Sequence, residues 1–362
     1  MWKVLLGFLI RLFSLLASCV LMIAGLLELP AADAERSTNP TAPQQMMVCF
    51  LDVGQADAAL VVADGEAMLI DGGNVGDSDK IVAALRKNRV SHLSVVVCTH
   101  GHEDHVGGLA AALKECTADT VYSPITRYDS KAFSDFVAYA KRRGCELTVP
   151  KQGDSFFLGG ATVTFLSPVP YAATVNDTSL VLRIEYGTHS FLFTADAEHD
   201  AELQMLDAGL IEQTTVLKVG HHGSDSSTSY VFLRKLLPEH AVISVEKGNS
   251  YGFPDEIILS RLADVGSTVY RTDLCGEITM ETDATTLTIT TERSYDAQKA
   301  AVAGDTEETA IPQGTAYIGN KKSMKFYRLE CRSLPSEENR SYFASRAAAV
   351  IAGYDACGQC KP

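Results

Sequence analysis

The sequence predicts an α/β fold in which two mixed β-layers are covered by helices. From residue 46 to residue 293, short apolar runs rich in β-branched residues alternate with amphipathic segments. The whole chain has 362 residues, of which 46% are hydrophobic and 21% are charged, so it is long enough to enclose a large core. Because the alternation shows no repeat of fixed period, we expect a layered α/β sandwich.

The first half of this region predicts a hairpin meander followed by alternating helices and strands. In the first helix, Ile81, Val82 and Leu85 share one face, and Gly144 can end the second helix. The strands are expected at residues 48–53, 58–62, 67–70 and 93–98, and the helices at residues 80–87 and 132–141.

The second half continues the pattern with a tight hairpin around residues 186–189. Pro238 stops the last expected helix, because proline lacks the backbone N–H that a helix needs. The strands are expected at residues 161–165, 180–185, 191–194, 216–219, 242–245 and 268–271, and the helices at residues 198–206 and 230–237.

Four metal-binding side chains follow the apolar run of residues 95–98. They are His100, His102, Asp104 and His105, which fall within six residues. A single histidine is usually a surface residue or a hydrogen-bonded core residue, but three histidines and an aspartate in the pattern HxHxDH are typical of a metal site. Imidazole and carboxylate are ligands of zinc and similar divalent cations. The spacing predicts that one pair faces one cation and the other pair faces a second.

This motif resembles the signature of the metallo-β-lactamase superfamily of hydrolases. Further motifs, over about residues 47 to 291, resemble the hydrolase domain of ComEC-type competence proteins: FLDVGQADA from Phe50, LIDGG from Leu69, NDTS from Asn176, FTAD ending at Asp196, VLKVGHHGS from Val216, NSYGFP from Asn249 and YRTD from Tyr270. The resemblance implies a four-layer αββα sandwich, two divalent metal ions, zinc or manganese, and a phosphodiester or other ester substrate.

The resemblance also implies the metal ligands. His100 and His102 would bind the first metal, while Asp104, His105 and His221 would bind the second, with Asp196 bridging both. The wider superfamily usually supplies a third histidine to the first metal. Here Asn176 is the expected ligand and Asp177 the alternative, and an oxygen ligand would favour harder cations such as manganese.

His221 and His222 are adjacent, and in extended chain their side chains would diverge. We therefore expect His221 as the ligand and His222 as a substrate contact or proton donor, with a supporting core role for His222 as the alternative. Together with Asp104 and Asp196, His222 completes the expected catalytic set.

Other residues are expected to support or line the site. Carboxylates that can orient ligand imidazoles are Asp52, Asp57 and Asp71. Residues that can contact the substrate are Ser224, Asn249, Tyr251 and Arg271. The chain departs from the resemblance at three positions, Ala56, Ala195 and Phe253, and the last of these stands where a histidine is common, which removes a potential phosphate or proton donor.

Residues 1–34 read as an export segment. Lys3 and Arg11 precede a 16-residue apolar run, and the sequence Ala32-Asp33-Ala34 offers a cleavage site. A lipoprotein signal ending at Cys19 and an uncleaved membrane anchor are the alternatives. All three predict a protein secreted or held at the outer face of the cytoplasmic membrane, with the membrane as a partner only through this segment. Residues 35–45 form a polar linker to the hydrolase domain at residues 46–293.

Residues 315–362 form a second module after a linker at residues 294–314. The module resembles the zinc-binding module of the Ada DNA-repair protein, with Cys331, Cys357 and Cys360 as ligands of a third, structural zinc. Tyr327 stands where that resemblance expects another ligand, so a disulfide between two of the cysteines is the alternative. Basic residues that can contact phosphates are Lys321, Lys322, Lys325, Arg328, Arg332, Arg340 and Arg346.

Charge separates the module from the body. The whole chain carries −14 and residues 315–362 carry +4, which leaves −18 on residues 35–314, since residues 1–34 are balanced. An acidic body disfavours unspecific binding of polyanions, whereas a basic module favours it.

The primary functional hypothesis is an exported two-metal phosphodiesterase or nuclease whose basic module holds DNA. The alternatives are a hydrolase of a small ester or cell-wall phosphoester and a noncatalytic nucleic-acid-binding surface protein. The sequence leaves the oligomeric state open.

Overall fold

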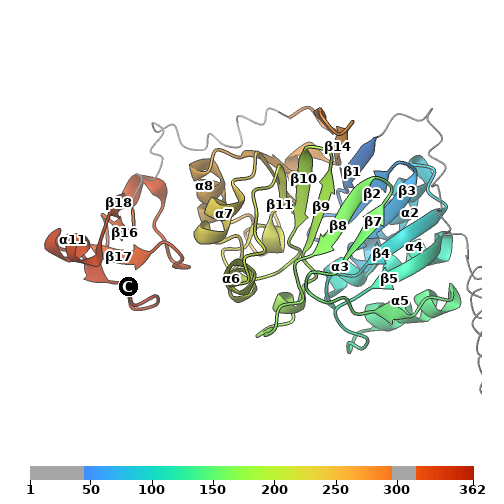
Figure 1. Ribbon diagram of the computed structural model, residues 1–362, viewed down its shortest axis with the longest axis horizontal. Helices are drawn as coiled ribbons and strands as arrows, with labels where there is room; N and C mark the ends of the chain where they lie inside the picture. The colour runs from blue at the N-terminus through green and yellow to red at the C-terminus, as the bar shows by residue number, and fades with distance from the viewer. Residues whose placement is uncertain (1–44, 296–314) are drawn as a thin grey trace, which may run out of the picture. The chain divides into compact units, whose positions relative to one another are not determined.

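The computed structural model describes residues 45–295 and 315–362. The predicted export segment and nearly all of both linkers lie outside these residues. Residues 45–295 form the body, in which two β-sheets lie face to face and helices cover the outer face of each sheet (Figure 1). This four-layer arrangement confirms the predicted αββα sandwich. None of the helices in the described ranges combines the length and apolar composition needed to cross a membrane.

The first sheet has eight strands in the order β15-β14-β1-β2-β3-β4-β5-β6. Neighbours from β3 to β6 are parallel, and the others are antiparallel. The strands are β1 (Met46–Phe50), β2 (Ala59–Ala63), β3 (Glu66–Ile70), β4 (His92–Val97), β5 (Thr117–Tyr122), β6 (Leu147–Thr148), β14 (Ile278–Thr282) and β15 (Leu287–Thr291). The helices on this side are η1 (Val75–Asp77), α2 (Ser78–Lys87), α3 (Glu103–Val106), α4 (Leu109–Glu115) and α5 (Lys131–Arg142).

The second sheet has seven strands in the order β13-β12-β11-β10-β9-β8-β7. Its strands from β10 to β13 are parallel. The strands are β7 (Ser155–Leu158), β8 (Ala161–Phe165), β9 (Leu182–Tyr186), β10 (His189–Phe193), β11 (Val216–Lys218), β12 (His240–Ile243) and β13 (Thr268–Arg271). The helical segments in this half are η2 (Asn176–Thr178), α6 (His199–Asp207), η3 (Gly220–Gly223), α7 (Tyr230–Leu236), α8 (Glu256–Asp264) and α9 (Thr272–Cys275).

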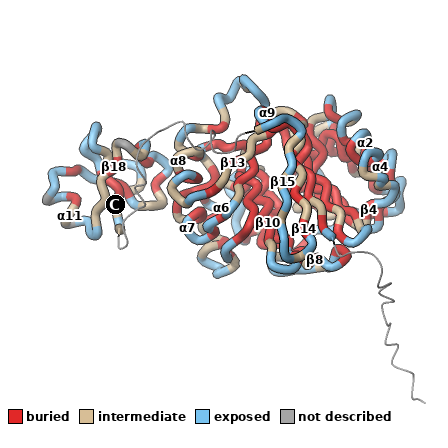
Figure 2. The backbone as a smooth tube through the Cα atoms, turned by 90° about the horizontal axis from the view of Figure 1, so that it is seen from above, coloured by how far each residue is buried: buried red, intermediate tan, exposed pale blue. Residues whose placement is uncertain are grey.

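The central strands are buried on both faces, as Figure 2 shows. In β4, Val95 and Val97 belong to the core between the sheets, whereas Val96 faces the helices on the other side. Between the sheets the rings of Phe50 and Phe193 stack with centroids 5.6 Å apart. Burial on both faces explains why the sequence of β4 is a continuous apolar run, and it fixes the ends of the strands that carry the site.

Residues 315–362 form a separate four-stranded sheet in the order β18-β16-β17-β19. Ile318 and Phe326, which are both fully buried, contribute to its small core. The elements are β16 (Tyr317–Asn320), β17 (Lys325–Arg328), η4 (Glu337–Asn339), β18 (Arg340–Phe343), α11 (Arg346–Ile351) and β19 (Asp355–Ala356).

Most expected elements of the body are present within a few residues of their predicted bounds, including the hairpin that joins β9 to β10. Several elements were not anticipated. One of them is β14, which pairs with β1 and extends the first sheet. Another is β15, whose sequence is rich in threonine and half-exposed and therefore lacks the apolar pattern of a buried strand. Helix α8 was also missed, although Ile258 and Leu262 lie four residues apart on its buried face.

Candidate metal centre

The predicted ligands come together because parallel strands end at the same edge of each sheet. His100 and His102 follow β4, and Asp196 follows β10 after a turn in which Ala195 has φ 46°. His222 follows β11, which is parallel to β10. Asp71 follows β3, which is parallel to β4. Carboxyl ends of parallel strands are a common place for sites in α/β proteins, because the loops that leave them converge.

The first group of ligand atoms belongs to His100, His102 and Asp196, and all of them lie within 4.8 Å of one another. His100 Nε2 lies 3.1 Å from His102 Nδ1 and 3.7 Å from Asp196 Oδ2. His100 is fully buried, and burial is the main cause that lowers its pKa well below the ordinary value. It is therefore neutral at pH 7 and has a lone pair ready for a metal.

The second group consists of Asp104, His105, Asp196 and His222, again within 4.8 Å of one another. Asp196 Oδ1 lies 3.2 Å from His105 Nε2 and 3.9 Å from His222 Nε2, and His222 Nε2 lies 3.2 Å from Asp104 Oδ2. Asp196 thus turns one oxygen to each group.

Two buried atoms of the second group, His105 Nε2 and Asp196 Oδ1, have no hydrogen-bond partner, although they lie 3.2 Å from each other. A buried polar atom without a partner costs free energy, about 1–3 kcal/mol for a neutral group, so such atoms normally face something that satisfies them. A divalent cation between these atoms would do so, and the donor set of imidazole and carboxylate fits zinc and related metals.

The carboxylates of this cluster control the protonation of its histidines. Burial alone would lower the pKa of His105, but Asp196, Asp71 and Asp104 outweigh it and raise that pKa well above the ordinary value. Burial likewise opposes protonation of His222, yet neighbouring carboxylates raise its pKa overall. Both shifts favour the protonated imidazoles in the metal-free protein, so a metal must compete with protons at these two histidines.

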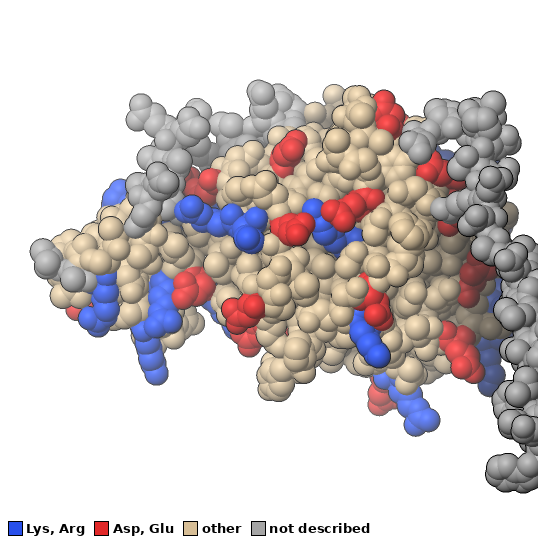
Figure 3. Space-filling view, in the orientation of Figure 1, with Lys and Arg blue, Asp and Glu red and all other residues tan. Residues whose placement is uncertain are grey.

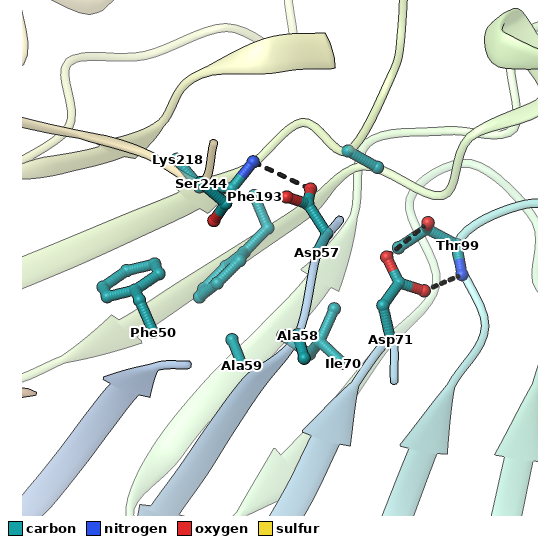
Figure 4. A pocket seen from close by; sticks show the side chains of 11 residues that line it. Phe50, Asp57, Ala58, Ala59, Ile70, Asp71, Thr99, Phe193, Lys218 and Ser244 are labelled. Carbon is teal, nitrogen blue, oxygen red and sulfur yellow. Dashed lines mark hydrogen bonds and ion pairs between the residues drawn. The ribbon is translucent and has the colours of Figure 1, made fainter. Parts of the chain in front are cut away.

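Asp71 has the supporting place that was expected of it. Its Oδ2 accepts from His105 Nδ1 at 2.8 Å and from Thr99 Oγ1 at 2.7 Å. Its Oδ1 accepts from the backbone N–H of Thr99 at 2.8 Å, and Figure 4 shows both contacts with Thr99. A proton held on His105 Nδ1 leaves Nε2 to face the metal group. This is the usual arrangement of a carboxylate behind a metal-binding imidazole.

Asp57 and Asp52 have different surroundings. Asp57 accepts a hydrogen bond of 2.7 Å from Lys218 (Figure 4). Its other oxygen lies 3.5 Å from His222 Nδ1. Asp52 instead pairs with Arg293 at 2.6 Å, so the structure does not place it behind a ligand imidazole. Lys218 was not anticipated, although a lysine inside the apolar strand β11 must be paired when it is buried.

Comparison with known families agrees with this geometry. The sequence model of the Metallo-beta-lactamase superfamily matches residues 51–246, which is more than half of the chain. The chain belongs to the metallo-β-lactamase superfamily. The model of the Metal binding domain of Ada matches residues 299–362. The superfamily domain therefore contains every member of the two groups, and it implies divalent metal ions and hydrolytic chemistry.

The domain is similar to part of several ComEC-type competence proteins. It is 29% identical over 250 residues to ComE operon protein 3 of Bacillus subtilis, covering 64% of this chain and 32% of that protein. It is 30% identical over 234 residues to Competence protein ComA of Neisseria gonorrhoeae, covering 64% and 31%. It is 28% identical over 235 residues to Recombination protein 2 of Haemophilus influenzae, covering 63% and 28%. The chain spans about a third of the length of these relatives.

Within this superfamily fold, the structure exchanges the expected places of the two adjacent histidines. His222 is buried within the second group, whereas His221 is partly exposed at its rim, with Nε2 3.8 Å from Asp196 Oδ2. The chain here is not extended, since both residues have positive φ, 48° and 55°. The expectation that adjacent side chains point in opposite directions holds only for extended chain, so it does not apply here. The geometry favours His222 as the ligand.

Asn176 is held through its amide nitrogen, which leaves its oxygen without a protein partner. Its Nδ2 donates to Glu198 Oε1 at 3.2 Å, while its Oδ1 is buried without a partner. Asp177 belongs to neither metal group and accepts instead from the backbone N–H of Glu198 at 3.2 Å. Glu198, which also lies 3.6 Å from His221 Nδ1, was not anticipated from the sequence.

The expected substrate residues are largely engaged with the protein itself. Ser224 is buried with its Oγ 3.1 Å from Ser226 Oγ. Arg271 forms a two-point ion pair with Asp273, with bonds of 3.0 and 2.7 Å. Asn249 bonds only within its own loop among the contacts described, whereas Tyr251 is 69% exposed. Of the four, Tyr251 is the one that is open to a ligand.

In the C-terminal module, Cys331, Cys357 and Cys360 form a third group within 4.8 Å. Cys331 and Cys357 are not bonded to each other, because their sulfur atoms lie 3.9 Å apart. Burial raises the pKa of Cys331 to about 12. Burial also acts on Cys357, but hydrogen bonds from the backbone of Cys360 and Gln359 lower its pKa overall. Three thiols in this arrangement suit zinc, which takes a fourth ligand in closed sites.

Proposed function

We propose that the body is a two-metal phosphodiesterase that cleaves single-stranded nucleic acid. The observation that carries this proposal is the pair of ligand groups that share Asp196, with His105 Nε2 and Asp196 Oδ1 buried and unpartnered between them. Two bound divalent cations would supply an activated water and stabilise the charge that develops on a phosphoryl group. The names of two relatives, which refer to competence and to recombination, support a nucleic-acid substrate.

The chain's own residues have distinct parts in this proposal. Asp71 fixes the proton of His105 on Nδ1, and Glu198 fixes the amide of Asn176 so that its oxygen faces inward. His221 stands at the rim with its Nε2 toward Asp196, where it can hydrogen-bond a substrate oxygen or give a proton to the leaving group.

We also propose that the C-terminal module binds zinc through its three cysteines and holds the substrate's backbone. Lys and Arg side chains project from the module in Figure 3, whereas on the described part of the body the same face mixes both signs of charge. Exposed basic residues of the module include Lys322, Lys325, Arg328 and Arg346. Each phosphate contact of this kind would add about one unit to the salt dependence of binding. Export through residues 1–34 remains part of the proposal.

The test of the catalytic proposal uses the purified full chain, stripped of metal and reloaded with zinc or manganese. We expect metal-dependent cleavage of a single-stranded oligonucleotide and of bis(4-nitrophenyl) phosphate. Asp104→Ala and Asp196→Ala should each abolish cleavage, whereas Asp207→Asn, an exposed carboxylate at the end of α6, should retain it. Unchanged cleavage in both alanine variants would refute the proposal. Hydrolysis of a small ester with no cleavage of oligonucleotide would favour the small-substrate alternative.

The test of the module's part is binding of an oligonucleotide by the full chain at several salt concentrations. Lys322→Gln combined with Lys325→Gln should weaken binding and reduce the salt slope by about two. Asp207 offers no such contact, and its Asn variant serves again as the control. An unaltered salt slope in the double variant would count against a role for this surface.

A further inference from the structure

Two stacked aromatic rings extend outward from the rim of the metal centre. Phe253 lies edge-on to His221, with ring centroids 5.9 Å apart and an interplanar angle of 63°. Tyr251 stacks on Phe253 at 5.5 Å and 14°, and 69% of Tyr251 is exposed. The ring of the ligand histidine His222 lies 6.2 Å from the ring of His221. A flat, solvent-facing ring therefore stands three ring contacts from His222 in the second metal group.

The loop that carries these rings is held in shape by one side chain. Asn249 Oδ1 accepts from the backbone N–H groups of Tyr251 and Phe253, both at 3.1 Å, and its Nδ2 donates to the carbonyl of Phe253 at 2.7 Å. Asn249 therefore orders both rings, which explains its place in the sequence motif.

The same loop is fastened to the segment that carries the metal-site histidines. The backbone N–H of Asp255 donates to the carbonyl of Gly223 at 2.9 Å, and Asp255 Oδ2 accepts from the backbone N–H of Asp225 at 2.8 Å. A Cβ at Gly223 would lie 2.5 Å from Pro254, so the two segments approach as closely as glycine allows. The aromatic pair is thus fixed relative to the site, and a ligand that stacks on it has little ordering cost to overcome.

We propose that Tyr251, supported by Phe253, is a subsite that stacks on a nucleobase next to the scissile phosphodiester. The inference rests on the proposed cleavage of single-stranded nucleic acid and adds the contact that would recognise an unpaired base, because bases in a duplex already stack on their neighbours. Aromatic side chains stack on unpaired bases of any sequence, since every base has a π-face. Where the family resemblance has a histidine, Phe253 exchanges a polar ring for an apolar stacking support.

The experiment compares two single-stranded oligomers with the metal-loaded full chain. One is oligodeoxyadenylate, and the other has the same length with tetrahydrofuran abasic residues in place of the bases. For the wild type we expect a KM about tenfold higher for the abasic oligomer. Tyr251→Ala should bring the ratio of the two KM values close to one, and Tyr251→Trp should retain it. Phe157→Ala, at a ring that is 71% exposed on β7, is the matched control and should keep the wild-type ratio.

The outcomes separate the subsite from the function on which it rests. If the wild type cleaves both oligomers with equal KM, or if Tyr251→Ala keeps the wild-type ratio, the subsite is refuted while the phosphodiesterase stands. If the wild type cleaves neither oligomer, the phosphodiesterase is refuted, and quenching of a 2-aminopurine oligomer decides the subsite. Quenching that Tyr251→Ala abolishes supports it, and quenching that this variant leaves intact overturns it.

Discussion

The metal groups of the body and the cysteine group of the module differ in the size of the packed structure that supports their ligands. In the body, the ligands follow β4, β10 and β11, whose strands are buried in two large sheets. Asp71 and Glu198 hold ligand side chains in orientation from behind. In the module, Cys331, Cys357 and Cys360 sit beside a small core on four short strands.

This difference implies that metal has opposite relations to folding in the two regions. The body buries enough apolar surface to fold before any metal binds, so its site is formed in advance. The module, at residues 315–362, is of the size at which a structural metal or disulfide commonly supplies the missing stability. Removal of metal by a chelator should therefore unfold the module and leave the body folded.

The largest expected effect is on the module. A chelator should unfold residues 315–362 while the body stays folded, because structural zinc contributes about 10–16 kcal/mol in zinc-finger peptides. Hydrogen exchange of the full chain, followed peptide by peptide, measures this directly. Peptides from β16 and β17 should lose protection, and those from β4 should keep it. If the module keeps the same hydrogen-exchange protection after chelation, the two regions do not differ in their dependence on metal.

The next effect is on catalysis in the body. Asp196→Asn removes the charge shared by both ligand groups, and we expect hydrolysis to fall by about a thousandfold or more, as for loss of other essential catalytic groups. Metal content by mass spectrometry should fall with it. The melting temperature of the metal-free variant should stay within a few degrees of the wild type, because the site does not hold the fold together. A variant that unfolds would mean that the body, too, depends on this cluster.

A smaller effect on metal affinity is expected when the hydrogen-bond partner of a ligand histidine is changed. Asp71→Asn weakens the hold on His105, and metal affinity should fall about 10- to 100-fold. Asp119→Asn breaks a comparable contact of 2.9 Å with His92 at an exposed position, and it should leave metal affinity unchanged. Competition with a fluorescent chelator gives both constants. Equal losses in the two variants would show that the effect is not local.

The smallest effect is that of pH on metal binding. In the metal-free fold the pKa values of His105 and His222 are raised above 6.5, so their ion pairs stabilise the fold fully below that pH and lose this contribution as pH rises through the raised values. A metal competes with those protons, and its affinity should rise about tenfold per pH unit for each proton displaced. Calorimetry in two buffers of different ionisation enthalpy counts the protons. Affinity that is flat from pH 6 to pH 8, with no proton release, would contradict this.

The sequence predicted those parts of the fold and site whose signals are local. The apolar run that forms β4 could be recognised because both faces of the strand are buried. The HxHxDH motif could be recognised because its four ligand residues lie within six consecutive positions. Asp196 was recognised because it directly follows another apolar strand.

Features set by tertiary contacts could not be predicted in the same way. Asp52 pairs with Arg293, which lies 241 residues later in the sequence. The residues next to Asp52 therefore could not show that it lies away from the ligand imidazoles. The choice between His221 and His222 depended on two positive φ angles that no periodicity reveals. Lys218 is the exception, since a charge within the buried strand β11 was a signal that could have been used.

The unequal division of carboxylates between the two groups has a consequence for occupancy. The second group has Asp104 in addition to the shared Asp196, whereas the first has two imidazoles beside that shared charge. Attraction for a dication is therefore greater at the second position. When metal is scarce, we expect this position to fill first, and any activity that needs both metals should follow the supply of the second equivalent.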